Sequence, residues 1–340
     1  MFLGSPFHTG YAGSPPVEKT EAAFVDTGAP VMGSPAFVGN RVFITSMNGY
    51  LFCINMEKTP SVVWKCRIGH KAVTTPAADG DGNIYAGSQD KYFYKVSSSG
   101  KVVGKFLTEG PIASSACILS DNNIVFSSMD GNVYCLNPDL ALQWKFPINH
   151  KDLEIMSSPA ADRQDNIYIG SDDGNIYSLD KSGKLRWKFS AGDAVVSSPL
   201  YDGEDGIYAG CVNGSFFCLS TEGKLKWKFT AQGSVESSPV MTKDNLIVFG
   251  SRDGNIYAFD TAGNLKWKYH ADGEIDASAS SDNEGGVYAA TEEGWVFAIS
   301  AKGEIRWKIK PGGSVFSSPA AYKGKCVIGS EDGKVYFTGR

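Results

Sequence analysis

The stretch "SDDGNIYSLDKSGKLRWKF", from Ser171 to Phe189, decides the fold because the chain nearly repeats it as "SRDGNIYAFDTAGNLKWKY" from Ser251 to Tyr269. A catalytic motif is normally stated once, since one pocket needs one nucleophile or one base. Recurrence at a fixed period instead marks a structural unit that stacks on copies of itself. The repeat therefore predicts architecture before it predicts chemistry.

Eight copies of this unit follow one another at a period of about 40 residues. Each begins with a Ser-Ser-Pro phrase or a close variant, ending at Pro35, Pro76, Ala116, Pro159, Pro199, Pro239, Ala279 and Pro319. Six copies carry a Trp near their end, at Trp64, Trp144, Trp187, Trp227, Trp267 and Trp307. No linker interrupts the series, so residues 1–340 are predicted to form a single domain.

Within each copy, short runs of alternating apolar and polar residues are separated by Gly-containing turns. This pattern predicts four antiparallel strands per copy: one from the Ser-Ser-Pro phrase, one at 167–170, one at 175–179, and one carrying Trp187. The chain has neither helical periodicity nor the apolar run of a membrane span. The sequence therefore predicts an all-β, eight-bladed β-propeller.

The two ends of the chain predict how the ring closes. The eighth copy stops at Arg340 after its third strand, "GKVYFTGR", and lacks a Trp-bearing strand. Residues 21–26, "EAAFVD", precede the first Ser-Pro phrase, where an outer strand would lie. We expect this N-terminal segment to complete the last blade, because backbone pairing there removes an open sheet edge.

The phrase "DGNIYSLDKSGKLRWKF" resembles the repeats of the pyrroloquinoline quinone (PQQ)-type β-propellers, in which a Gly turn, an aromatic residue, Asp, a second Gly turn and Trp follow in order. The resemblance covers the whole chain, and the opening "FLGSPFHTGYAG" is similar to the lead-in segment of such proteins. It implies that the Trp docks neighbouring blades. The family includes quinone-dependent dehydrogenases, the lipoprotein of the outer-membrane barrel assembly machinery and cofactor-free scaffolds, so function depends on the site.

A dehydrogenase of this family is the first alternative. The resemblance implies, for such an enzyme, insertions that build the quinone pocket, adjacent cysteines over the cofactor and sometimes a Cys-x-x-Cys-His haem site. Here the copies are nearly free of insertions, and the seven cysteines form no adjacent pair and no Cys-x-x-Cys. No Arg or Lys cluster is evident for the three carboxylates of PQQ. We expect no cofactor and no catalysis, with PQQ and calcium in an oxidoreductase as the alternative.

Metal and nucleic-acid sites are not predicted either. Asp79, Asp81 and Asn83 have calcium-loop spacing, but Ile84 stands where that loop needs Gly, which favours a polar hairpin turn. Basic residues flank Trp in the later copies, as at Arg186 and Lys188, but they are spread over the outermost strands of a chain with net charge −5. We interpret them as charges that blunt exposed blade edges, and expect no nucleic-acid partner.

Cysteine usage bears on the compartment. Cys53, Cys135 and Cys218 occupy one third-strand position in alternate blades, too far apart for a disulfide. Unpaired thiols suit a reducing compartment, and residues 1–20 lack the basic start and apolar run of a signal peptide. We expect a cytoplasmic monomer, with export as the alternative if a leader precedes this sequence.

Comparing the eight copies with one another predicts a binding surface. The position four residues before each Pro is uniformly apolar and should pack between blades, whereas the next position varies and, pointing the opposite way, should face the mouth of the central channel. The middle turn varies too and should open on the same face. The candidate binding residues are Met32, Met156, Glu236, Asp276 and Phe316 from the first strand, and Met47, Met129 and Arg252 from the turn.

The chemistry of these residues predicts binding rather than catalysis. Unconstrained, solvated positions are the alternative, but methionines and Phe316 are costly to expose and useful on an adaptable surface. Glu236 and Asp276, in neighbouring copies, should repel unless a cation compensates. We expect a non-catalytic binding or scaffold propeller that holds a protein or small ligand at the channel mouth. The alternatives are a PQQ-dependent oxidoreductase and a small-ligand or saccharide sensor domain.

Overall fold

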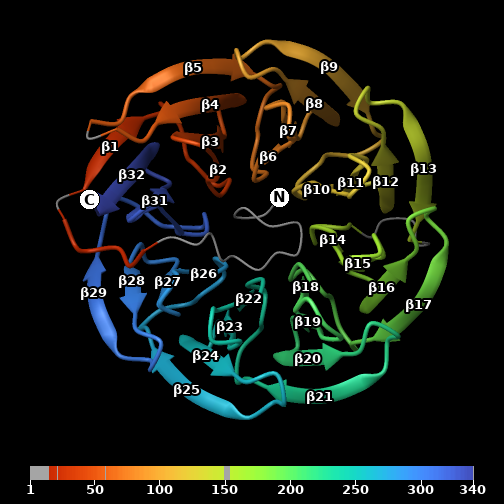
Figure 1. Cartoon of the computed structure of the whole chain (residues 1–340), viewed down its shortest axis with the longest axis vertical. Helices are drawn as coiled ribbons and strands as arrows, with labels where there is room; N and C mark the ends of the chain where they lie inside the picture. The colour runs from red at the N-terminus through yellow and green to blue at the C-terminus, as the bar shows by residue number, and fades with distance from the viewer. Residues whose placement is uncertain (1–14, 21, 58, 149–153, 340) are drawn as a thin grey trace.

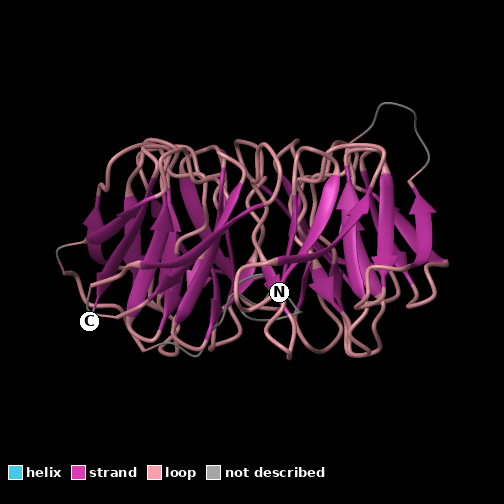
Figure 2. Ribbon diagram, turned by 90° about the horizontal axis from the view of Figure 1, so that it is seen from above, coloured by secondary structure: helices cyan, strands magenta, loops and turns pink. Residues whose placement is uncertain are grey.

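The computed structural model describes residues 15–20, 22–57, 59–148 and 154–339, which form eight four-stranded antiparallel sheets around a central axis (Figure 1). Seen from the side, the strands run between two faces covered by loops (Figure 2). No helix occurs in the described ranges, and none of their segments could cross a membrane as a helix. The predicted eight-bladed β-propeller is confirmed.

The first four blades follow the chain from the axis outwards. Blade one contains β2 (Ala36–Val38), β3 (Arg41–Ser46), β4 (Tyr50–Asn55) and β5 (Val62–Arg67). Blade two contains β6 (Ala77–Ala78), β7 (Ile84–Gly87), β8 (Tyr92–Val96) and β9 (Val102–Leu107). Blade three contains β10 (Cys117–Ile118), β11 (Ile124–Ser128), β12 (Asn132–Leu136) and β13 (Leu142–Pro147). Blade four contains β14 (Ala160–Ala161), β15 (Ile167–Gly170), β16 (Asn175–Leu179) and β17 (Leu185–Ser190).

The next three blades repeat the same order, and the last borrows a strand. Blade five contains β18 (Leu200–Tyr201), β19 (Ile207–Gly210), β20 (Ser215–Leu219) and β21 (Leu225–Thr230). Blade six contains β22 (Val240–Met241), β23 (Ile247–Gly250), β24 (Asn255–Phe259) and β25 (Leu265–His270). Blade seven contains β26 (Ser280–Ser281), β27 (Val287–Ala290), β28 (Val296–Ile299) and β29 (Ile305–Ile309). Blade eight contains β30 (Ala320–Tyr322), β31 (Lys325–Gly329), β32 (Lys334–Gly339) and β1 (Ala23–Asp26).

Closure of the ring agrees with the prediction. Strand β1 pairs antiparallel with β32, from Ala23 opposite Phe337 to Asp26 opposite Lys334, and lies outside it in Figure 1. The segment before β1 fills the seam with blade seven. There the Val17 carbonyl accepts from Trp307 Nε1 at 2.9 Å, and the Val17 amide donates to the Tyr288 hydroxyl at 2.8 Å. The lead-in residues 2–13 lie outside the described ranges.

A buried apolar ring packs each blade on the one before it. The predicted positions are between 0 and 1% exposed: Val31, Ala72, Ile112, Ile155, Val195, Val235, Ile275 and Val315. Several lie against the glycine that ends the second strand of the preceding blade, so that a Cβ on Gly210 would come within 2.4 Å of Val235. The same contact joins Gly329 of blade eight to Val31 of blade one. The ring therefore closes with the packing it uses elsewhere.

Aspartates organise the two inner turns of many blades. Asp79 accepts hydrogen bonds from the backbone amides of Asp81 and Asn83, at 3.0 and 2.8 Å, and from the Tyr85 hydroxyl at 2.9 Å. These donors satisfy the carboxylate, so the first turn of blade two is the hairpin turn that the sequence predicts.

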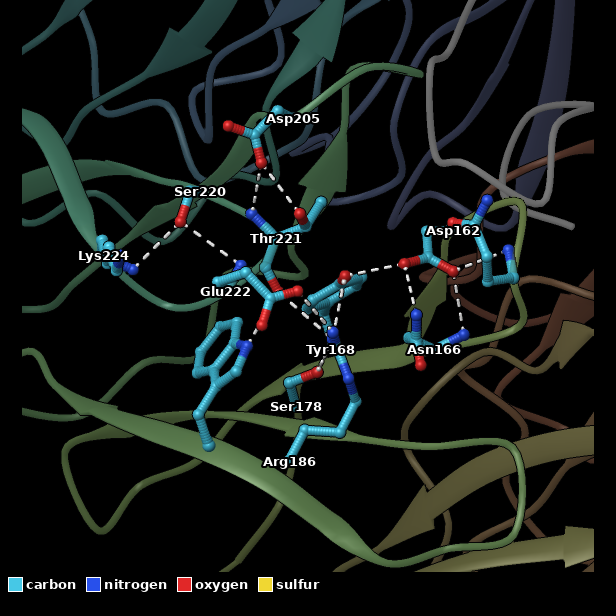
Figure 3. A network of polar contacts seen from close by, with 12 residues as sticks. Asp162, Asn166, Tyr168, Ser178, Arg186, Asp205, Ser220, Thr221, Glu222 and Lys224 are labelled. Atoms are coloured by element: carbon cyan, nitrogen blue, oxygen red, sulfur yellow. Dashed lines mark hydrogen bonds and ion pairs between the residues drawn. The ribbon is translucent and has the colours of Figure 1, made fainter.

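Tryptophan docks six of the eight blades to the next, as the resemblance implied. In the seam between blades four and five, the Trp187 indole donates to the Thr221 carbonyl at 2.8 Å. Figure 3 shows Arg186 reaching the same turn, where it donates to the Thr221 carbonyl at 3.1 Å and pairs with Glu222 at 2.8 Å. The interpretation of Arg186 as a charge that merely blunts the edge was incomplete, since it also ties two blades together.

In five blades a glycine of the outer turn makes room for the indole of the preceding blade: Gly100, Gly183, Gly223, Gly263 and Gly303. Gly223 has a positive φ of 77°, and a Cβ there would come within 2.6 Å of the Trp187 ring. Gly39 also has a positive φ, of 61°, but nothing lies within 4 Å of its would-be Cβ. A side chain at either position would therefore suffer the same unfavourable left-handed backbone. Only at Gly223 would it also collide with the indole.

We expect Gly223→Ala to lower the free energy of unfolding by about 2–4 kcal/mol, because left-handed backbone and overpacking both disfavour the methyl group. Gly39→Ala should cost about 1–2 kcal/mol, since it carries the backbone term alone. Chemical denaturation of the two variants measures the difference. Equal losses would show that the indole does not rest on the glycine.

Candidate functional site: the mouth of the central channel

The central channel contains a cavity of about 190 Å³ lined by the first strands and the loops that lead into them. Four of the predicted binding residues line it together: Met32, Glu236, Asp276 and Phe316. Val73 and Ala113, which hold the same position in blades two and three, line it as well. Together with Ala277, this variable position, which lies in the loop before each first strand, supplies the part of the wall that is not formed by hydroxyl residues.

A ring of hydroxyl groups forms the polar part of the lining, built by the second residue of each Ser-Ser-Pro phrase: Ser34, Thr75, Ser115, Ser158, Ser198, Ser238, Ser278 and Ser318. These residues are 3 to 8% exposed. In most of them the side-chain oxygen accepts a hydrogen bond from the backbone N–H of the equivalent residue in the preceding blade. The Ser198 amide, for example, donates to the Ser238 hydroxyl at 3.0 Å, and the Ser318 amide donates to the Ser34 hydroxyl at 2.9 Å. The phrase therefore links the blades around the channel.

Two hydroxyls of this ring have no hydrogen-bond partner within the described residues. They belong to Thr75, which is 4% exposed, and Ser318, which is 3% exposed. Their backbone amides do bond, to Ser115 and Ser34, but no protein atom of the described ranges pairs with their side chains. The fully buried side-chain atoms without a partner in the described ranges are those of Asp172, Asn283 and Thr291, so the Thr75 and Ser318 oxygens are instead open to the cavity that they line. Both hydroxyls are therefore available to a molecule in the cavity.

The wall has an acidic sector formed by blades six and seven. Arg252, from the turn between β23 and β24, donates from Nε to Asp276 Oδ1 at 2.9 Å and lies 3.3 Å from Glu236 Oε1. Glu274 and Glu292 lie 3.7 and 3.8 Å from the same guanidinium. Four carboxylates thus surround one cation, and the sector retains an excess of negative charge. Glu236 and Asp276 line the cavity itself, whereas Arg252, Glu274 and Glu292 lie outside its lining.

The expected repulsion between Glu236 and Asp276 is relieved by Arg252, the compensating cation that the sequence argument required. The remaining repulsion among the carboxylates acts instead on Glu292, whose charged form it disfavours. The hydrogen bond it shares with Asp276, then burial, then the Asp276 charge raise the pKa of Glu292 to about 7, against the opposing effect of Arg252. This carboxyl therefore changes its protonation state near neutral pH.

Sequence comparison did not single out Glu274 or Glu292 as site residues. Glu292 holds the same turn position as Arg252, one blade later, and that equivalence was the available signal. Glu274 directly precedes the apolar position Ile275, at a place where two other late copies have Ser234 and Ser314.

Four predicted residues do not line the cavity. Arg252, on the middle turn of blade six, is outside the lining but contacts Glu236 and Asp276, which belong to it. Met47 and Met129 lie half-buried on the middle turns of blades one and three. Met156 holds the same position as Met32 but is 48% exposed and outside the lining. The structure therefore keeps only part of the predicted methionine surface at the channel.

Other candidate chemistry in the described residues is weaker. A cleft of about 300 Å³ lies between blades three and four, but its Asp165 already accepts from the Ser120 amide at 2.9 Å. The seven cysteines are buried and free of disulfides. Burial raises the pKa of Cys53 and Cys117 to about 11, which keeps these thiols protonated. Neither feature offers a reactive group.

The channel mouth does not fit PQQ. A tricarboxylate needs converging cations, whereas the wall presents Glu236 and Asp276 and its neighbouring guanidinium, Arg252, is engaged by Asp276. Carboxylates of the quinone would meet carboxylates of the protein. We therefore derive no chemistry through this cofactor.

Comparison with known proteins places the chain in a family. The family model described as "Beta-alanine-activating enzyme, beta-propeller" matches residues 25–338. None of the curated proteins is similar in sequence at a significant level.

Solved structures share the fold. BamB from Moraxella catarrhalis superposes with a TM-score of 0.77 at 16% identity, covering 95% of this chain and 100% of the other. Sqt1 from Saccharomyces cerevisiae gives a TM-score of 0.80 at 14% identity, with coverages of 96% and 100%. A europium-containing methanol dehydrogenase gives 0.80 at 12% identity, with coverages of 98% and 90%. At these identities the likeness concerns the fold alone.

Proposed function

The chain belongs to the β-propeller family of the beta-alanine-activating enzyme, and we propose that it acts as a non-catalytic binding module whose site is the mouth of the central channel. Enzymes and non-enzymes share this fold, so the proposal has to be supported by the site. The protein or small ligand would enter the cavity that Met32, Glu236, Asp276 and Phe316 line.

One observation carries the proposal. The eight copies repeat their core, their turns and their docking contacts, yet the position facing the channel changes from copy to copy and forms a cavity with an apolar and an acidic sector. The neighbouring position, which is buried and apolar in every copy, already provides the packing between blades. Packing therefore does not account for the variation at the position that faces the channel. A concave site with a few convergent polar groups is what a ligand needs.

An experiment with matched variants tests binding at this site. Phe316→Ala alters the mouth, and Leu185→Ala, at a side chain 49% exposed on the circumference, is the control. Thermal shifts are measured over a panel of metabolites and candidate protein partners. We expect a stabilising ligand of the wild type to stabilise Leu185→Ala equally and Phe316→Ala at least about tenfold more weakly in affinity. Loss of binding in Leu185→Ala alone would move the site to the circumference.

A second arm tests the absence of catalysis. The protein is incubated with PQQ and calcium, and quinone absorbance and dye-linked alcohol oxidation are followed. We expect neither, because the acidic wall repels the cofactor. Turnover would establish the oxidoreductase alternative in place of our proposal.

A further inference from the structure

We propose that the ligand of the channel mouth is a small free amine, a primary ammonium group on a short stem that ends in a hydrogen-bond acceptor. This inference rests on the proposed binding function and narrows it to one chemical class. Two independent features of the same cavity support it, the acidic sector of the wall and the unpartnered hydroxyls of the ring.

The acidic sector calls for a further cation. Glu236, Glu274, Asp276 and Glu292 together carry four potential negative charges, and Arg252 supplies one positive charge. Arg252 binds Asp276 through both Nε and a terminal nitrogen, so the guanidinium is committed to that carboxylate. An ammonium ion is a compact charge with three donors, which suits the remaining carboxylate oxygens.

The ring calls for an acceptor. Thr75 and Ser318 are more than nine-tenths buried, line the cavity and have no side-chain hydrogen bond to any described residue. Their hydroxyls can donate to a ligand oxygen. A protein lysine side chain brings only its ammonium tip and methylene stem, which offer the hydroxyl hydrogens no acceptor. This difference favours a free molecule with a second polar end.

The size and the apolar sector fix the stem. A cavity of about 190 Å³ is of the size that holds a small organic molecule, since a cavity of about 150 Å³ binds benzene. Met32 and Phe316 supply apolar surface on the wall, which suits methylene groups. The amino alcohol 4-amino-1-butanol carries an ammonium group, a methylene stem and a hydroxyl acceptor, and it serves as the probe.

Protonation of Glu292 should couple to binding. The charged groups around it are Arg252, Glu236, Glu274 and Asp276, and a bound ammonium ion favours its ionised form. With a pKa of about 7, the ionised fraction rises from about one tenth at pH 6 to about nine tenths at pH 8. Affinity for the amine should rise by up to about tenfold over that interval, and Glu292→Gln should remove the dependence.

The test compares four probes by ligand-observed NMR titration of the full chain: 4-amino-1-butanol, n-butylamine, 1-butanol and Nα-acetyl-lysine amide. We expect 4-amino-1-butanol to bind about three- to tenfold more tightly than n-butylamine, which lacks the acceptor, and about tenfold or more tightly than 1-butanol, which lacks the charge. Thr75→Val with Ser318→Ala should abolish the first difference. Glu236→Gln, alone or with Asp276→Asn, should reduce or abolish the second.

The control removes two acids from outer turns, by Asp139→Asn with Glu304→Gln, and should leave all affinities unchanged. Equal binding of 1-butanol, or unchanged amine affinity in Glu236→Gln, would overturn the inference. Acetyl-lysine amide binding as tightly as the amino alcohol would overturn it in favour of a protein side chain. A ligand of another class that Phe316→Ala loses would leave the binding function standing and remove only the amine.

Discussion

Deleting residues 1–26 is expected to open the ring and cause aggregation, or to lower the melting temperature by about 10 °C or more. The deletion removes β1 and leaves the outer edge of β32 unpaired from Lys334 to Phe337. It also removes Val17, which is 2% exposed and bonds to Tyr288 and Trp307 of blade seven. Both the last blade and its seam with blade seven are then incomplete.

Two controls isolate closure as the cause. Deleting residues 1–10 leaves β1 and Val17 in place and should shift the melting temperature by no more than about 2 °C. Adding a synthetic peptide of residues 15–26 to the longer deletion should restore part of the stability, since backbone pairing with β32 gives it a site. Calorimetry and size-exclusion chromatography measure both. A monomeric 1–26 deletion with wild-type stability would contradict closure by β1.

The fold was predictable because the sequence contains eight copies of the same structural repeat. Repetition separates what packing requires from what varies, so the strand limits of blade four, Ile167–Gly170 and Asn175–Leu179, agree with the structure. The same logic located the apolar ring from Val31 to Val315. Closure of the ring was predictable because the eighth copy lacks its own outer strand, while a segment with the pattern of such a strand precedes the first copy.

The site was less predictable because it depends on contacts between blades. Arg252 binds Asp276, 24 residues away, across the seam between blades six and seven. The alternation of strand residues says which face a side chain takes but not how far a turn lies from the axis. Met47 and Met129 lie on turns between the second and third strands, farther from the axis than Met32, and they do not line the cavity.

Charged groups beside the tryptophans show the same limit. A pattern of basic residues on outer strands was enough to predict an exposed edge, but the partners of these residues lie on other turns. Arg306 reaches inward to Asp282, a fully buried carboxylate, at 2.9 Å. Lys226 instead stays near the surface, 3.4 Å from Asp205. Periodicity gives equivalent positions, and the contacts then depend on residues that differ between copies.

The Trp227→Ala substitution is expected to cost about 3–5 kcal/mol of unfolding free energy, the largest effect of any single change considered. The Trp227 indole donates to the Thr261 carbonyl at 3.0 Å and stacks on Phe259 with ring centroids 5.6 Å apart. A Cβ on Gly263 would come within 2.8 Å of the same ring, so the indole fills the space beside that turn. Removing it leaves a cavity between blades five and six and an unpaired carbonyl.

Two further variants separate the contributions. Trp227→Phe keeps an aromatic ring and loses the N–H, so it should cost about 1–2 kcal/mol less than Ala. Trp295 lies one residue before β28 rather than within it, and its ring faces Lys308 and Lys310 with the nearer ammonium 4.7 Å from the centroid. Trp295→Ala removes these contacts and some partly buried packing against the core of blades six and seven, and it should cost about 1–2 kcal/mol, less than Trp227→Ala. If denaturation showed Trp295 to be the more damaging site, the interblade tryptophans would not be what holds neighbouring blades together.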